Sequence, residues 1–443
     1  MRVRLLNKWE ALRSSYWFVP VIMGASAIAF SFLTIVLDIE LESEVIRTLG
    51  VFWTGGHEGA RGLLETIAGS MITVAGVTFS ITMVALSQAS AQFGPRLLRN
   101  FMRDTGNQIV LGAFIATFLY SIMVLRTIRE DPEFVPYISV TVGIVLSIVS
   151  LAVLIFFIHH VARSLQAPYV IAEVAQELFH SINRLFPSGV GQQPPEDEEE
   201  QIKKDYEEAF KQNGQKILAQ RSGYMQVVDD DGLMEISKTN DLTLRLFYRP
   251  GHFVIHDNVI AKVISARDIN DEVRSKLQQA FIIGKERTPT QDVEFAISQL
   301  VEVAVRSLST GVNDPFTTIT CIDWLSAALT HLVKKTFPSP LRYDDQGRLR
   351  IVFDKPLTFQ GVAGEAFNQI RQYSEGSVDV SIRLLEGISL IIEQTENEAY
   401  REVLMRHARL VERQSTREAP SRDDRKDLED RFDKVNKQPD RSE

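Results

Sequence analysis

The sequence predicts a membrane α-helical domain with four transmembrane helices, followed by a cytoplasmic α+β domain with a small β-unit and several helices. Four long stretches near the N-terminus are almost free of charge, and each is close to the roughly 20 residues that a helix needs to cross a bilayer. Beyond them, short apolar runs broken by turns alternate with helical patterns, a mixture typical of an α+β domain. Membrane helices and a folded soluble domain therefore share one chain of 443 residues.

The predicted spans lie within a transmembrane domain of residues 1–166. They cover about residues 17–37, 63–87, 109–125 and 135–158. The first span carries no charge and is too long for a cleavable signal peptide, and no small-residue cleavage site follows it. The sequence therefore predicts a multi-pass membrane protein.

Basic residues beside the spans predict the orientation, because Lys and Arg are enriched in cytoplasmic loops. Four basic residues precede the first span, three lie between the second and third, and Arg163 follows the fourth. The two opposite loops hold fewer basic residues in a more acidic setting. Both termini are therefore expected in the cytoplasm.

The second span carries a stripe of small and hydroxylated residues on one helical face, at steps of three and four residues. The candidate residues are Glu65, Gly69, Thr73, Gly76, Ser80 and Ser87. One interpretation is close packing against a neighbouring helix, because small residues let backbones approach and hydroxyls can bond across. The other is a pore or solute path that hydroxyls line, with Glu65 at its outer mouth.

A basic segment follows the second span and contains Arg96, Arg99 and Arg103. It is typical of an amphipathic stretch at the membrane surface, with its cations near anionic lipid headgroups. The alternative is that these residues only determine the topology. The lipid bilayer is the expected partner in both interpretations.

Three separated blocks of the sequence resemble one known family. They are SQASAQFGPRLLRNFMRD and LGAFIATFLYSIMVLRTIR within residues 86–129, Arg249-Pro250-Gly251-His252-Phe253-Val254, and SLSTGVNDPFTTITCIDWL from Ser307 to Leu325. Over about residues 10–410 the chain resembles the bacterial predicted membrane proteins catalogued as domain of unknown function 2254. The resemblance implies a bacterial inner-membrane protein with a cytoplasmic domain. It implies no particular activity, substrate or catalytic residue.

The chain after the spans divides into three predicted segments. Residues 167–221 are expected to form a helix and an acidic linker, and residues 222–413 the cytoplasmic α+β domain. Residues 414–443 mix charges of both signs with few apolar residues, a composition that predicts a disordered tail.

Asn313 and Asp314 precede Pro315 at the predicted start of a helix. We interpret them as part of a helix–helix corner. The functional alternative is a ligand-binding loop, because these polar side chains stand beside a helix N-terminus, which favours anions.

Composition and motifs argue against several function classes. The chain has 48 Lys and Arg against 57 Asp and Glu, and its formal net charge of −9 argues against a dedicated nucleic-acid binder. A single cysteine, Cys321, excludes a disulfide-stabilised fold. The sequence lacks the common nucleotide-binding, metalloprotease and hydrolase motifs, so we expect no enzyme activity, no metal and no cofactor.

Two functions are compatible with these features. The first is a homo-oligomer with a pore or transport role, regulated by the cytoplasmic domain. Self-assembly is expected because four spans per chain are too few for most transporters. The second is a membrane-anchored scaffold or sensor, in which the spans only hold the cytoplasmic domain at the membrane.

Overall fold

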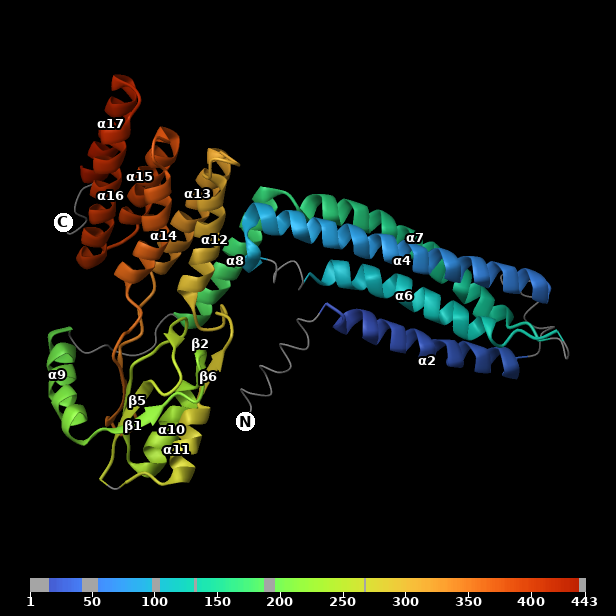
Figure 1. The fold of residues 1–443 in the computed structure, drawn as a ribbon, viewed down its shortest axis with the longest axis horizontal. Helices are drawn as coiled ribbons and strands as arrows, with labels where there is room; N and C mark the ends of the chain where they lie inside the picture. The colour runs from blue at the N-terminus through green and yellow to red at the C-terminus, as the bar shows by residue number, and fades with distance from the viewer. Residues whose placement is uncertain are drawn as a thin grey trace. The chain divides into compact units, whose positions relative to one another are not determined.

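The computed structural model describes residues 16–41, 55–97, 104–130, 134–186, 196–266 and 268–437. The chain divides into two compact units, Met1–Tyr169 and Val170–Glu443. The N-terminal unit contains the apolar helices, and the C-terminal unit contains the two β-sheets (Figure 1).

Four long helices form the N-terminal unit. They are α2 (Phe18–Glu40), α4 (His57–Phe93), α6 (Thr105–Leu125) and α7 (Tyr137–Ser164), and the short 3₁₀-helix η1 spans Pro95–Leu97. All four are long and apolar enough to cross a membrane. The four apolar helices that the sequence predicts are thus confirmed, and α4 extends beyond residues 63–87 at both ends.

α6 packs against α2, α4 and α7 and so forms the centre of this bundle. One apolar cluster of the bundle includes Val110, Phe114 and Phe157. A second cluster includes Leu64 and Tyr120. These buried side chains come from α4, α6 and α7, and their packing joins these three helices, while α2 packs against α6.

Two sheets lie in the C-terminal unit, with strand orders β1-β5-β3-β8-β7 and β4-β2-β6. The strands are β1 (Gln215–Leu218), β2 (Gly223–Val228), β3 (Thr243–Leu246), β4 (Phe253–Val254), β5 (Val259–Ile264), β6 (Phe281–Gly284), β7 (Leu341–Tyr343) and β8 (Leu349–Phe353). The pairs are antiparallel, except that β3 and β8 pair in parallel with Leu244 opposite Ile351. The predicted α+β character of this region is confirmed.

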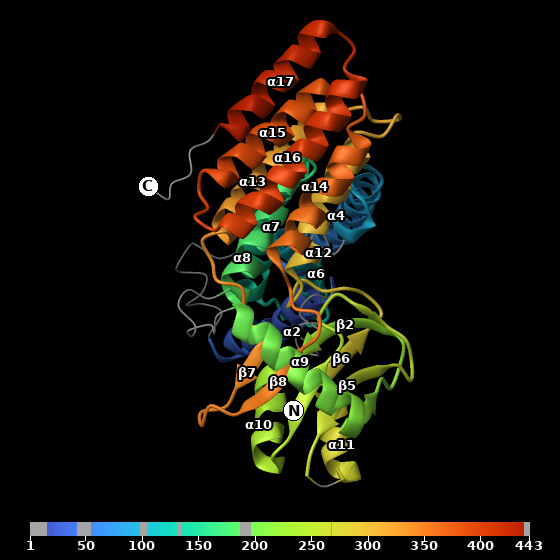
Figure 2. The same ribbon diagram turned by 90° about the vertical axis from the view of Figure 1, so that its left-hand side faces the viewer.

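Most helices of the C-terminal unit fall into two groups (Figures 1 and 2). They are α8 (Ala167–Leu185), α9 (Glu196–Asn213), α10 (Asp230–Asn240), α11 (Asp271–Gln279), α12 (Val293–Ser307), α13 (Pro315–Leu332), α14 (Phe359–Tyr373), α15 (Val378–Ile392), α16 (Glu398–Glu418) and α17 (Arg422–Asn436). Helices α12 to α17 pack together as a bundle, and α10 and α11 lie beside the strands. Fully buried side chains such as Leu325, Leu384 and Ile388 form the interior of that bundle.

The segment predicted as a helix and an acidic linker, residues 167–221, begins with helix α8, and its residues 187–195 lie outside the described residues. Its acidic run begins helix α9, and β1 at its end pairs with β5 through Gln215 and Val263. The sheet therefore begins before residue 222, because a strand that lies earlier in the chain completes its edge.

The predicted disorder of residues 414–443 is wrong for the described part of that segment. α16 continues to Glu418, and α17 follows it and packs against α15 and α16. Leu428 and Val435, seven residues apart, are buried, and Arg431 forms an ion pair with Glu386 of α15. Two apolar side chains on one face are enough to attach an otherwise charged helix, which composition alone does not reveal.

Candidate functional site on the outward face of α4

The polar stripe of the second span lies on the side of α4 that points away from the rest of its bundle. The predicted residues Glu65, Gly69, Thr73, Gly76, Ser80 and Ser87 are all exposed. The opposite side of α4 packs against the bundle through buried residues such as Leu64, Met71 and Ala75. Packing of the stripe against a helix of the same bundle is therefore excluded for the described residues.

Glycine and hydroxyl residues repeat every seven residues along this side. We call the surface formed by Gly62, Glu65, Thr66, Gly69, Thr73, Gly76, Ser80 and Ser87 the α4 face. No atom beyond the local backbone lies within 4 Å of where a Cβ would sit at any of its three glycines. Gly62 and Thr66 were missed in the sequence analysis, although they precede Gly69 and Thr73 by the same seven residues.

Three hydroxyls of the α4 face, those of Thr66, Thr73 and Ser80, donate to carbonyl oxygens of their own helix. Thr73 Oγ1 lies 2.8 Å from the carbonyl oxygen of Gly69, and Ser80 Oγ lies 2.9 Å from that of Gly76. Such bonds satisfy the hydroxyl proton and leave the oxygen lone pairs exposed. The face is therefore flat at its glycines and polar at its hydroxyls.

Glu65 stands at one end of the α4 face and faces solvent in this chain. Its carboxylate lies 3.4 Å from Arg61 Nε, and the two side chains are 57% and 68% exposed. An ion pair this exposed contributes little to stability. The carboxylate of Glu65 is accordingly accessible to a solute or to another chain.

The predicted basic patch is described only in part. Arg96 is exposed on η1, directly after α4. Arg99 and Arg103 lie outside the described residues. Contact of this segment with lipid headgroups stays a prediction.

Inside the bundle, polar groups bond from one helix to another. Asp38 of α2 is 8% exposed and accepts hydrogen bonds from the backbone N–H groups of Ile138 at 2.8 Å and Ser139 at 2.9 Å. It also accepts a bond of 2.6 Å from the Ser139 hydroxyl, and so caps the N-terminus of α7. The hydroxyls of Tyr120 and Thr34 lie 2.9 Å apart. No local pattern in the sequence predicts this role of Asp38, because its partners lie about 100 residues away in the chain.

Further polar pairs lie along α6 and α7. They are Thr117 with Ser150 at 2.9 Å, and Asp104, which caps α6, with His160 at 2.6 Å. Phe114 and Phe157 are each 1% exposed and lie between these two pairs along the helices. Phe114 is one turn from Thr117 on α6, and Phe157 is one turn from His160 on α7. Apolar packing therefore separates the two pairs inside the described bundle.

Comparison with known proteins identifies the family. Residues 13–389 match the family described as "Predicted membrane protein (DUF2254)". The chain belongs to the DUF2254 family. Two similar relatives are the uncharacterized proteins Rv1290c of Mycobacterium tuberculosis (strain ATCC 25618 / H37Rv) and Mb1321c of Mycobacterium bovis. Each is 29% identical over 437 residues, which cover 95% of this chain and 81% of the relative. No solved structure matches the chain.

Arg249-Pro250-Gly251, part of one block that carries the DUF2254 resemblance, forms a structural corner. Arg249 donates to both carboxylate oxygens of Glu294 on α12, at 2.7 and 2.8 Å. Gly251 has φ +94°, and a Cβ there would overlap the carboxylate of Asp292. Asp292 caps α12 and pairs with Arg287 at 2.8 Å. The block therefore holds the start of α12 in place.

Asn313 and Asp314 form the predicted helix–helix corner between α12 and α13, which is confirmed. The Asp314 carboxylate accepts bonds from the backbone N–H groups of Phe316 at 3.1 Å and Thr317 at 3.2 Å, and so caps α13. Asn313 has φ +48°, the left-handed conformation that Asn tolerates in turns. The Asp314 carboxylate occupies the helix N-terminus that would attract an anion, and the ligand-loop interpretation stays a prediction.

Groups for metal or nucleophilic chemistry are scarce in the described parts of the chain. There, no cluster of three or more His, Cys, Asp or Glu side chains could hold a metal ion. Cys321 is fully buried, and burial raises the pKa of its thiol above the ordinary range. A raised pKa disfavours the reactive thiolate, so Cys321 is suited to packing and not to nucleophilic attack.

Proposed function

We propose that this DUF2254 protein is an inner-membrane protein that self-assembles through the α4 face and encloses a path for a small polar solute. In this proposal both termini and the C-terminal unit lie in the cytoplasm, and that unit regulates the path. The observation that carries the proposal is the outward position of the α4 face, with open space at Gly62, Gly69 and Gly76.

The exposed surface of α7 supports a special role for the α4 face. α7 exposes large apolar side chains that suit lipid acyl chains, among them Val145, Ile148, Val149, Leu151, Ile155 and Phe156. Glycines and hydroxyls offer acyl chains little apolar area, but they let another helix approach closely. A second copy of the chain presents the same seven-residue repeat and can pack against it along its length.

The interior of a single bundle supports a path between copies over a path within one chain. Phe114 and Phe157 separate the buried polar pairs of α6 and α7. On the α4 face, in contrast, polar atoms recur from Glu65 to Ser80, and the exposed apolar side chains of Met83 and Val84 follow before Ser87. Facing copies would line a shared path with these atoms, and Glu65 would attract cations to one mouth.

The basic residues support the proposed orientation. Arg96 follows α4 and Arg163 ends α7, whereas acidic residues such as Asp38 and Glu40 end α2. Positive residues favour the cytoplasmic side of a membrane. The bacterial origin of the relatives is consistent with an inner-membrane location.

Cysteine cross-linking tests the assembly. Cys321→Ser removes the single native thiol, and Gly76→Cys or Val149→Cys then places one thiol on the α4 face or on the exposed side of α7. A disulfide forms only where two Cα atoms come within about 7 Å. We expect oxidised membranes to yield linked dimers for Gly76→Cys and not for Val149→Cys. Equal linking of both variants, or of neither, would contradict the proposal.

Solute flux tests the path. We expect liposomes that contain the protein to conduct small ions, Glu65→Gln to reduce cation flux several-fold by removing a mouth charge, and Ser80→Leu to reduce flux by placing a bulky apolar group on the path. Val149→Leu on α7 is the matched control and should leave flux unchanged. Flux that is absent, or unaltered in both α4 variants, would favour the second candidate, a membrane-anchored scaffold or sensor.

A further inference from the structure

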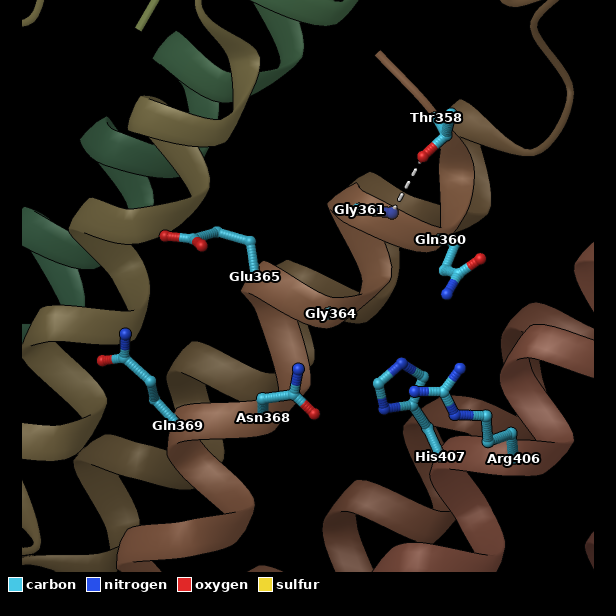
Figure 3. A pocket seen from close by; sticks show the side chains of 9 residues that line it. All are labelled: Thr358, Gln360, Gly361, Gly364, Glu365, Asn368, Gln369, Arg406 and His407. Atoms are coloured by element: carbon cyan, nitrogen blue, oxygen red, sulfur yellow. Dashed lines mark hydrogen bonds between the residues drawn. The ribbon is translucent and has the colours of Figure 1, made fainter. Parts of the chain in front are cut away.

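A polar cavity of about 520 Å³ lies between α14 and α16 in the C-terminal unit (Figure 3). Its volume falls within the roughly 300–1,000 Å³ that is typical of small-molecule sites. Figure 3 shows Arg406 and His407 of α16 facing Gln360 and Asn368 of α14. All the residues that line the cavity belong to the C-terminal unit.

His407 is a buried polar group with an unmet hydrogen bond. Its side chain is 4% exposed, and its Nδ1 has no hydrogen-bond partner among the described residues. Burial, assisted by the charges of Arg406 and Arg371, lowers the pKa of His407 to about 4, so the ring is neutral at neutral pH. Buried polar atoms in folded proteins nearly always have a partner, so the orphan Nδ1 of a residue that lines the cavity marks a hydrogen bond that a water or a ligand would complete.

The uncompensated charge in the cavity is positive. Arg406 forms no ion pair with the part of the chain that the structure describes. Glu365, the acidic residue of the lining, points to the other side of α14, where its charge acts on Arg287. The first turn of α14, which Thr358 caps, adds the partial positive charge of a helix N-terminus.

Neutral donors and open space complete the cavity. The side-chain amides of Gln360 and Asn368 make no hydrogen bond with other described residues. Gly364 faces the cavity without a side chain, and a Cβ there would meet Asn368 at 3.2 Å. The cavity thus offers one cation, several donors and a wall that has no side chain of its own at Gly364.

We propose that this cavity binds a small molecule that carries an anionic oxygen group, either a phosphate ester or a carboxylate. The Arg406 guanidinium pairs with the anionic group, and the amides of Gln360 and Asn368 donate to its oxygens. His407 closes the cavity from α16 and provides a neutral polar edge. The proposal stands whether or not the α4 face forms a path, because it rests on the C-terminal unit alone.

Calorimetric titration of the full-length protein in detergent tests this site, with inorganic phosphate and succinate as the two probes. We expect saturable binding of at least one probe in the millimolar range, which also assigns the anionic group. Arg406→Gln should weaken that binding tenfold or more, because a charge-assisted bond is lost. Arg409→Gln, an exposed position on the same helix outside the cavity lining, is the matched control and should bind as the native protein does.

Gly364→Leu separates binding from folding. Leucine is a better helix former than glycine, so the variant should unfold at a temperature no lower than that of the native protein. Its side chain fills the cavity, so binding of the probe should be lost. Failure of both probes to bind the native protein would overturn the proposal. Equal weakening by Arg406→Gln and Arg409→Gln, or full binding to Gly364→Leu, would overturn it as well.

Discussion

Polar groups in the interior of the N-terminal bundle and polar groups on the α4 face use their hydrogen bonds differently. In the interior, Asp38 and Tyr120 bond to groups of other helices. On the α4 face, Thr73 and Ser80 donate to carbonyl oxygens of their own helix. Interior groups therefore fix the helices of one chain to each other. The hydroxyls of the α4 face, in contrast, form their hydrogen bonds without any other helix of the bundle. Substitutions inside should change stability, and substitutions on the face should change assembly.

The largest expected effect is at Asp38. Asp38→Asn keeps the shape of the side chain but replaces one acceptor oxygen with an NH₂ donor, which would point at a donor of Ile138 or Ser139. We expect the free energy of unfolding to fall by about 2–4 kcal/mol, measured by denaturant titration in mixed micelles. Glu40→Gln, an exposed acid on the same helix, should change it by less than about 0.5 kcal/mol. Equal effects would mean that the interior bonds of Asp38 do not stabilise the bundle.

His407 offers a third case, a buried ring whose Nδ1 has no hydrogen-bond partner among the described residues, and its titration should appear as a pH dependence of stability. Its folded pKa of about 4 lies below the ordinary histidine pKa of 6.5, so the unfolded chain binds the proton more tightly. The stability that its neutral form contributes is complete above about pH 6.5 and is lost as the pH falls toward 4. Between about pH 6.5 and pH 4, the free energy of unfolding should therefore fall less in the His407→Gln variant than in the native protein. We expect the difference to reach up to about 3 kcal/mol.

The measurement is the free energy of unfolding at several pH values in buffer without phosphate or carboxylate. His252, whose pKa burial also lowers to about 4, should preserve part of the slope in the His407→Gln variant. Identical pH dependence in the native protein and in this variant would show that His407 already has a partner in solution.

The third effect concerns assembly. Gly76→Leu places a bulky side chain where the α4 face is flat, and we expect association between copies to weaken about tenfold, or roughly 1.4 kcal/mol. The thermal stability of the monomer should stay the same or rise, because leucine favours helix more than glycine does. Single-molecule photobleaching in liposomes measures the number of copies per particle. Val149→Leu on α7 serves as the control, and equal loss of association in both variants would remove the distinction between these surfaces.

The smallest expected effect is at Thr73. Thr73→Ala removes a hydroxyl that bonds to its own helix, so the free energy of unfolding should change by less than about 0.5 kcal/mol. Tyr120→Phe removes a buried hydroxyl that bonds to Thr34 of another helix, and it should cost about 1 kcal/mol. Denaturant titration of the two variants side by side would show whether interior and outward hydroxyls differ. Similar losses of unfolding free energy in the two variants would contradict the distinction between interior hydroxyls and hydroxyls of the α4 face.

The features that sequence analysis predicted correctly depend on neighbouring residues. Apolar length alone located the four helices, and the Asp314-Pro315 pair located the start of α13. Helix periodicity placed the small and hydroxyl residues on one side of α4, because that pattern repeats within a single element. Which way this side faces depends on packing against α6 and α7, and the periodicity contains no information about that.

The features that sequence analysis missed depend on residues far apart in the chain. The Asp38 cap joins residues 101 positions apart, and the parallel pairing of β3 with β8 spans a similar distance. α17 was missed for another reason, since only Leu428 and Val435 anchor a segment whose composition is otherwise that of a disordered tail. The polar cavity was missed because its residues come from α14 and α16, and neither helix carries a recognisable motif alone.

The seven-residue spacing of the α4 face also determines the hand of any assembly. A straight α-helix has 3.6 residues per turn, so positions seven apart drift by about 20° around the axis with each repeat. Two copies can keep Gly62, Gly69 and Gly76 in contact only if their helices wind around each other in a left-handed supercoil. A small rotation of each helix about its own axis would then replace the glycines in the contact by neighbouring side chains along its whole length. Rotation of α4 about its axis would therefore open or close the contact between the copies.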